Sequence, residues 1–277
     1  MARSIGLAAL TVLELTPPQM VDCAAQAGYS HVGLRLIPAT PTEAHYATIG
    51  DTPLMREVLA RLAGTGVAVL DVEILRLKPL TDVRDFLPLL ETAARLGALN
   101  ALVAGNDPEE SRLIDRFGAL CDLAAPFGIA PCIESMPWTD CRDFAQGARI
   151  VRAVNRPNAG LLIDPIHFDR GGSTASEITQ VPAAWLRYVQ LCDAPATRPT
   201  DTETLLHQAR TDRLLPGDGG LDLSGILRAL GPDLPLGLEI PMAALARSVP
   251  AVERARRALA ATRALLQRLS LDGSTHG

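Results

Sequence analysis

The stretch LLIDPIHF, residues 161–168, joins a short apolar run to an aspartate and a histidine. Such a run is typical of a buried strand, where a carboxylate is costly unless it is paired or bound to a metal. Asp164 and His167 are therefore candidate functional residues at the end of a strand. The fold that would hold this strand follows from the segments on either side of it.

Short apolar runs recur along the chain and alternate with segments of helical spacing, most of them bounded by proline or glycine. The predicted strands are 4–10, 31–37, 67–75, 98–104, 128–134, 159–164, 187–193 and 234–240. The predicted helices are 16–28, 51–66, 81–97, 108–128, 139–155, 174–182, 222–230 and 248–269. Eight alternating pairs indicate parallel βαβ units, and so an α/β protein with a single (β/α)8 TIM barrel over residues 1–277.

A doubly wound open sheet is the alternative fold, but no GxGxxG follows the first strand. No linker or low-complexity run divides the chain, so one domain is expected. The polar end, residues 270–277, is predicted to be a disordered tail.

Composition limits the classes of function. The chain has 277 residues and a net charge of −5, so it lacks the basic surface that nucleic-acid binding requires. The N-terminal apolar stretch has no cleavage site and is too short to span a bilayer, which predicts neither a signal peptide nor a membrane partner. Five cysteines without a CxxC pair indicate reduced thiols and a cytoplasmic protein.

Oxygen-bearing side chains end four consecutive predicted strands, and in a barrel such strand ends meet at the catalytic rim. These residues are Glu134, Asp164, Gln190 and Glu239. Any one of them alone could be a helix cap or a loop contact. Together, without lysines beside them, their carboxylates would repel one another unless a divalent cation neutralised them. Oxygen ligands without thiols suit Mn²⁺, Mg²⁺ or Co²⁺, with Zn²⁺ as a further candidate.

The chain resembles the sugar phosphate isomerase/epimerase family of xylose isomerase-like TIM barrels. The resemblance rests on these four residues, on the DPIH motif at 164–167 and on RLLPGDGGLD at 213–222. The resemblance covers essentially the whole chain. It implies that four residues bind one divalent metal: Glu134, Asp164, Gln190 and Glu239. It also implies that His167 and Arg213 contact substrate oxygens. Many members carry histidine in place of Gln190, while hydroxypyruvate isomerase-like members carry glutamine, which leaves the preferred metal open. Arg210 competes with Arg213 for its role.

A metal that binds a carbonyl and a neighbouring hydroxyl acidifies the adjacent C–H bond. Glu134 and Glu239 would then serve as acid and base, through a metal-stabilised enediolate. The predicted function is epimerisation or isomerisation of a small sugar, ketose or hydroxy-keto acid. If the enediolate expels a β-hydroxyl instead, the same residues perform a dehydration like that of inosose or 3-dehydroshikimate dehydratases, and this alternative stays open.

Residues near the early strand ends are candidates for selecting the substrate. Glu73 would bind substrate, and Trp138 would form a wall against a sugar ring or else pack beneath the next helix. Arg35 and Arg76 suit an acidic or phosphorylated substrate, or else pair with Glu73. The segment 40–51 could close over the pocket, and the connection 193–220 is long enough to indicate a functional loop.

The sequence disfavours two other classes of protein. Abasic-site DNA endonucleases share this barrel but need further histidines for a metal cluster, and this acidic chain has only five. A non-catalytic sugar-binding protein would not need both Glu134 and Glu239. The expected partner is therefore a small carbohydrate or keto acid, with neither nucleic acid nor membrane. Helix 248–269 could pack on the barrel or on a second copy, which leaves a homo-oligomer open.

Overall fold

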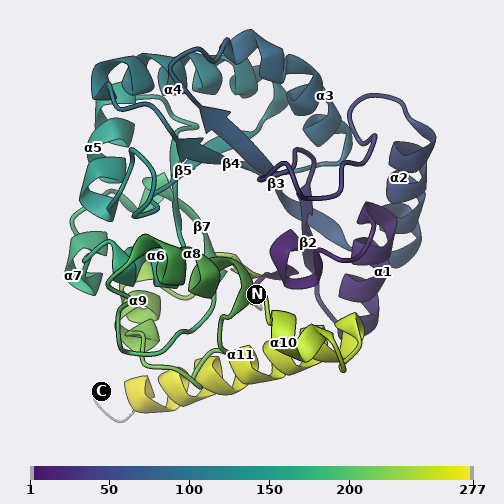
Figure 1. The fold of residues 1–277 in the computed structure, drawn as a ribbon, viewed down its shortest axis with the longest axis vertical. Helices are drawn as coiled ribbons and strands as arrows, with labels where there is room; N and C mark the ends of the chain where they lie inside the picture. Colours follow the sequence, from purple (N-terminus) through teal and green to yellow (C-terminus); the bar gives the residue numbers. More distant parts are fainter. Residues whose placement is uncertain (1–2, 275–277) are drawn as a thin grey trace.

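The computed structural model describes residues 3–274, in which eight parallel strands close into a barrel in the order of the sequence (Figure 1). The ring is completed by β1 pairing with β8. The strands are β1 (Ile5–Leu7), β2 (His31–Arg35), β3 (Ala68–Leu77), β4 (Asn100–Gly105), β5 (Ala130–Glu134), β6 (Gly160–Ile163), β7 (Leu186–Leu191) and β8 (Leu236–Leu238). The predicted (β/α)8 TIM barrel is confirmed, and each strand lies within a few residues of its predicted range.

Helices surround the barrel and connect successive strands (Figure 1). The α-helices are α1 (Pro17–Ala27), α2 (Pro53–Thr65), α3 (Leu87–Arg95), α4 (Glu110–Ala124), α5 (Phe144–Val154), α6 (Pro165–Arg170), α7 (Ala175–Ile178), α8 (Thr202–Thr211), α9 (Leu223–Leu230), α10 (Ala243–Ala246) and α11 (Ala251–Ser274). Short 3-10 segments are η1 (Ala9–Val12), η2 (Val83–Phe86), η3 (Ala125–Phe127) and η4 (Ala183–Trp185). Along the described part of the chain, no helix has the length and apolar content that a membrane crossing requires.

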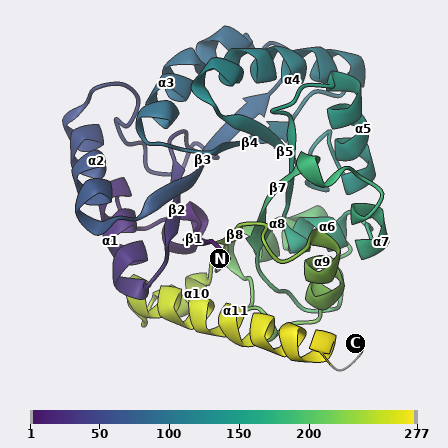
Figure 2. The ribbon, with the colours of Figure 1, turned by 180° about the vertical axis from the view of Figure 1, so that it is seen from behind.

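Three helices were not predicted: α6, α8 and α10. Two of them are only four and six residues long, too short for a helical period to be visible. The third, α8, is mostly polar and lies inside the connection 193–220, where Asp201 caps it by accepting a hydrogen bond from the Thr204 amide at 2.8 Å. The final helix α11 extends through Ser274, beside α1 (Figure 2). Residues 275–277 of the predicted tail lie outside the described residues.

The apolar core has two parts because successive strand residues point to opposite faces. The larger cluster fills the space between the strands and the helices. The smaller cluster lies inside the barrel, and its members are Leu70, Ile74, Leu102, Ala104, Ala130, Cys132, Met136, Leu162 and Tyr188. The side chains at the carboxyl ends of the strands therefore lie above a packed barrel interior rather than an open channel.

Candidate active site

The four rim residues predicted as metal ligands all lie where the structure ends their strands. Glu134 is the last residue of β5, Gln190 lies in β7, and Glu239 follows β8. Asp164 follows β6 and caps α6, where it accepts a hydrogen bond from the Ile166 amide at 3.0 Å. All four side chains are buried.

Arg213 joins two of these carboxylates. Its Nη1 lies 2.6 Å from Asp164 Oδ2, and its Nη2 lies 3.0 Å from Glu239 Oε2. Backbone carbonyls of Ala209 and Glu239 accept further hydrogen bonds from the guanidinium, which is almost fully buried. A metal was predicted as the neutralising charge, whereas the chain also supplies a cation of its own in Arg213. Between the two competing arginines, Arg213 makes these contacts and Arg210 does not.

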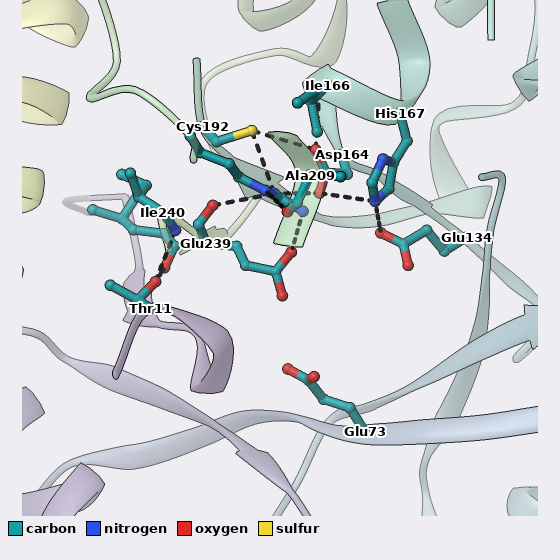
Figure 3. Close-up of polar contacts among 12 residues, drawn as sticks. Thr11, Glu73, Glu134, Asp164, Ile166, His167, Cys192, Ala209, Glu239 and Ile240 are labelled. Atoms are coloured by element: carbon teal, nitrogen blue, oxygen red, sulfur yellow. Dashed lines mark hydrogen bonds and ion pairs between the residues drawn. The ribbon is translucent and has the colours of Figure 1, made fainter. Parts of the chain in front are cut away.

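His167 stands beside the same carboxylates in a neutral form. Its Nε2 lies 3.6 Å from Asp164 Oδ2 and 3.9 Å from Glu134 Oε1, distances too long for hydrogen bonds (Figure 3). Burial lowers the pKa of His167 to about 4, although the charge of Asp164 acts in the opposite direction. Trp138 packs edge-on against the imidazole, with ring centroids 4.8 Å apart and planes at 87°. Packing against Trp138 orients the imidazole ring beside the two carboxylates.

The carboxylates differ in their affinity for protons. Burial, with the charges of Asp164 and Glu239, raises the pKa of Glu134 well above its usual range. Burial raises the pKa of Glu239 to about 8, although the Arg213 guanidinium opposes this shift. Burial would also raise the pKa of Asp164, but Arg213, His167 and the Ile166 amide outweigh it, so the pKa is lowered. One anionic carboxylate thus lies beside two that tend to hold protons.

Several polar atoms at the centre of the site have no hydrogen-bond partner within the described residues. They are Glu134 Oε1, His167 Nδ1, and both Oε1 and Nε2 of Gln190. Buried polar atoms are nearly always satisfied in folded proteins, so these atoms are available to an ion or a ligand. Ligand atoms of Glu134, Asp164 and His167 lie within 4.8 Å of one another, a spacing that could hold a metal ion.

A cavity of about 330 Å³ opens above these residues. The residues named from the sequence that line it are Glu134, Trp138, His167, Arg213 and Glu239, together with Arg35, Arg76 and Arg210. Asp164, Gln190 and Glu73 do not line it. Thr40 and Glu43, from the segment predicted to close over the pocket, form part of its wall. Its size suits a small molecule rather than a polymer.

The early strands place Glu73 on the opposite side of the site from Glu239 (Figure 3). Its Oε2 accepts hydrogen bonds from Arg35 at 2.6 and 2.9 Å, while Oε1 has no partner among the described residues. Arg35 also contacts Glu43 at 3.2 Å. Of the two arginines, Arg35 is therefore the one that pairs with Glu73. Arg76 instead donates to the Asn106 side chain and to the Ala39 carbonyl.

Asp193 has a structural role at the site that was not predicted from the sequence. This buried carboxylate, two residues beyond β7, accepts hydrogen bonds from the amides of Ala194, Gly217, Gly219 and Leu221 at 2.8 to 3.2 Å. A side chain at Gly219 would collide with Asp193 and with the Ala194 carbonyl. Asp193 thereby fixes the PGDGG turn that follows Arg213. The available signal was an aspartate at the end of the predicted strand 187–193, with the glycine-rich PGDGG turn later in the same connection.

The family model described as the xylose isomerase-like TIM barrel matches residues 21–265. The chain belongs to this family. It is 27% identical over 158 residues to the inosose isomerase of Bacillus subtilis strain 168, a match that covers 53% of this chain and 55% of the relative. It is 30% identical over 136 residues to the 3-dehydroshikimate dehydratase of Pseudomonas aeruginosa PAO1, covering 48% of this chain and 21% of that protein.

The match to the inosose isomerase thus spans about half the length of that relative. Among solved structures, the IOLI protein with a bound zinc atom superposes with a TM-score of 0.78 at 20% identity. That comparison covers 96% of this chain and 99% of the other. The superposition supports the barrel fold found here.

Proposed function

We propose that this member of the xylose isomerase-like family is a metal-dependent isomerase or epimerase of a small sugar, ketose or hydroxy-keto acid. The observation that carries the proposal is a pair of buried carboxyl groups, Glu134 and Glu239, that line one cavity from different strands of the barrel. Two such groups can exchange protons with a substrate bound between them. The isomerase named among the relatives supports this class of reaction.

The donor set fits a divalent ion because unpartnered oxygen and nitrogen atoms converge on it. Glu134, Asp164, Gln190 and Glu239 would hold the ion, with His167 close enough to Glu134 and Asp164 to replace one of them. When bound, the metal would act as a Lewis acid that polarises a substrate carbonyl. Mn²⁺, Mg²⁺ and Co²⁺ suit the oxygen donors, and the zinc in the structural relative adds Zn²⁺.

The chain's own residues supply the proton transfers. One of Glu134 and Glu239 removes the proton from the carbon beside the carbonyl, and the other delivers a proton to the opposite face or to the neighbouring carbon. Because β5 and β8 carry them on different sides of the barrel rim, they reach the substrate from different directions. Neutral His167 can donate or accept a hydrogen bond with a substrate hydroxyl. Trp138 shields that side of the cavity from water.

Dehydration is the second candidate because one relative is a 3-dehydroshikimate dehydratase. After the same proton abstraction, loss of a β-hydroxyl with a proton from the second glutamate would give water and a conjugated ketone. The two reactions share the first step and differ only in where the second proton goes.

Deuterium incorporation tests the shared step. The Mn²⁺-loaded protein is incubated in deuterium oxide with an inosose, 3-dehydroshikimate and a ketohexose, and exchange at the carbon beside the carbonyl is followed by NMR. Ultraviolet absorbance of a conjugated product distinguishes dehydration from isomerisation. We expect Glu134→Gln and Glu239→Gln each to slow exchange by roughly 10²–10⁴-fold. Glu91→Gln, at an exposed position on α3, is the matched control. If both active-site variants still exchange deuterium at the wild-type rate, the proposal is contradicted.

A further inference from the structure

Four arginines line the cavity, and they fall into two pairs: Arg35 and Arg213, then Arg76 and Arg210. The first two are buried and form ion pairs with carboxylates of the site. Within the described residues, Arg76 and Arg210 form no ion pair, and the partners of Arg76 are a neutral amide and a backbone carbonyl. Two guanidinium groups therefore bring positive charge to the cavity without a directly paired carboxylate, although the charges of Glu134 and Glu43 act on Arg76 from a longer distance.

The unpaired arginines come from different parts of the barrel. Arg76 lies near the end of β3 and is half-buried, whereas Arg210 lies on α8 and is exposed. Both guanidinium groups line the same cavity. Burial lowers the pKa of Arg76, the positive charges of Arg210 and Arg35 add to this effect, and the charges of Glu134 and Glu43 oppose it. Like charges that face one small cavity are unfavourable unless an anion lies between them.

We propose that the substrate carries an oxyanion, a carboxylate or a phosphate ester, which binds Arg76 and Arg210 while the hydroxy-carbonyl end faces Glu134 and Glu239. This inference rests on the proposed function and adds a substrate class to it. The planar guanidinium matches either oxyanion and can bind it through two parallel hydrogen bonds. Asn106 and Ala39 hold Arg76 in place before substrate arrives, which reduces the ordering cost of binding.

Matched compounds separate charge from shape. Dissociation constants are measured by isothermal titration calorimetry on the Mn²⁺-loaded protein for 3-dehydroshikimate against a neutral inosose, and for fructose 6-phosphate against fructose. We expect one anionic compound to bind at least about 10-fold more tightly than its neutral counterpart. The first pair reports a carboxylate and the second a phosphate ester. Raising the salt concentration should weaken only the anionic binding.

Variants then assign the preference to the two arginines. Arg76→Gln and Arg210→Gln should each weaken binding of the anion by on the order of 10- to 100-fold and leave the neutral compound unchanged. Arg263→Gln removes the same charge from an exposed position on α11 outside the cavity lining, and it should change neither. Because Arg210 is exposed, Arg210→Gln remains informative even if Arg76→Gln fails to fold.

The inference is overturned if neither anion binds more tightly than its neutral counterpart. It is also overturned if the variants weaken both members of a pair equally. Should a neutral compound undergo exchange that depends on Glu134 and Glu239 while the anions show no advantage, the proposed function would stand and this inference alone would fail. Tight binding of an anion that depends on Arg76 and Arg210, without exchange in any compound, would instead remove the proposed function.

Discussion

Replacing Arg213 with glutamine tests how the site is held together. The guanidinium is buried and contacts Asp164 at 2.6 Å and Glu239 at 3.0 Å. Removing it leaves two buried carboxyl groups without their cation. Loss of one partner from a buried ion pair costs about 3–5 kcal/mol of folding free energy. For a chain of this size each kcal/mol corresponds to roughly 2–4 °C, so the melting temperature of the metal-free protein should fall by about 6–20 °C.

The assay is thermal unfolding followed by circular dichroism, with and without Mn²⁺. A bound divalent cation would replace the lost positive charge, so Mn²⁺ should stabilise Arg213→Gln at least as much as the wild type. Arg84→Gln removes an arginine from an exposed pair with Asp82 and should leave the melting temperature unchanged, because such pairs contribute little. A loss below about 1 kcal/mol in Arg213→Gln, or a smaller Mn²⁺ effect than in the wild type, refutes the assigned role of Arg213.

Three further predictions concern protons and the loop after β7. Because burial raises the pKa of Glu134 and Glu239, the folded metal-free protein holds protons that the unfolded chain releases, and its stability should fall as the pH rises from about 5 through 8. Metal binding near pH 7 should therefore release protons. Calorimetry in two buffers of different ionisation enthalpy measures this release, and a value of zero would contradict the assigned protonation. Asp193→Ala leaves four backbone amides without their hydrogen-bond acceptor and should lower the free energy of unfolding in urea by more than about 2 kcal/mol. An unchanged urea midpoint of unfolding would show that the turn is stable without Asp193.

The barrel was predictable because its signal is repeated. Eight apolar runs that alternate with capped helical segments are compatible with few folds, and each predicted strand lies close to an observed one. The positions of the rim residues were predictable for the same reason, since each lies within one residue of the end of a strand. The exact ends of the helices were less visible, as the extension of α11 through Ser274 shows.

The contacts among the site residues were not predictable in the same way. The pairing of Arg35 with Glu73 depends on the register of β2 against β3, which places these two residues side by side and which the sequence does not reveal. The position of Arg213 depends on α8 and on the turn held by Asp193, within a connection that showed only its length. The approach of His167 to Glu134 depends on α6, a helix of six residues.

An anomalous-difference map from a crystal soaked in Mn²⁺ would show whether the rim residues hold a metal ion. We expect one strong peak within ligand distance of Glu134 and Asp164, completed by oxygens of Gln190 and Glu239 or by His167. A map from the same soak with no peak among these residues, and with Arg213 still bound to both Asp164 and Glu239, would contradict the proposed metal site.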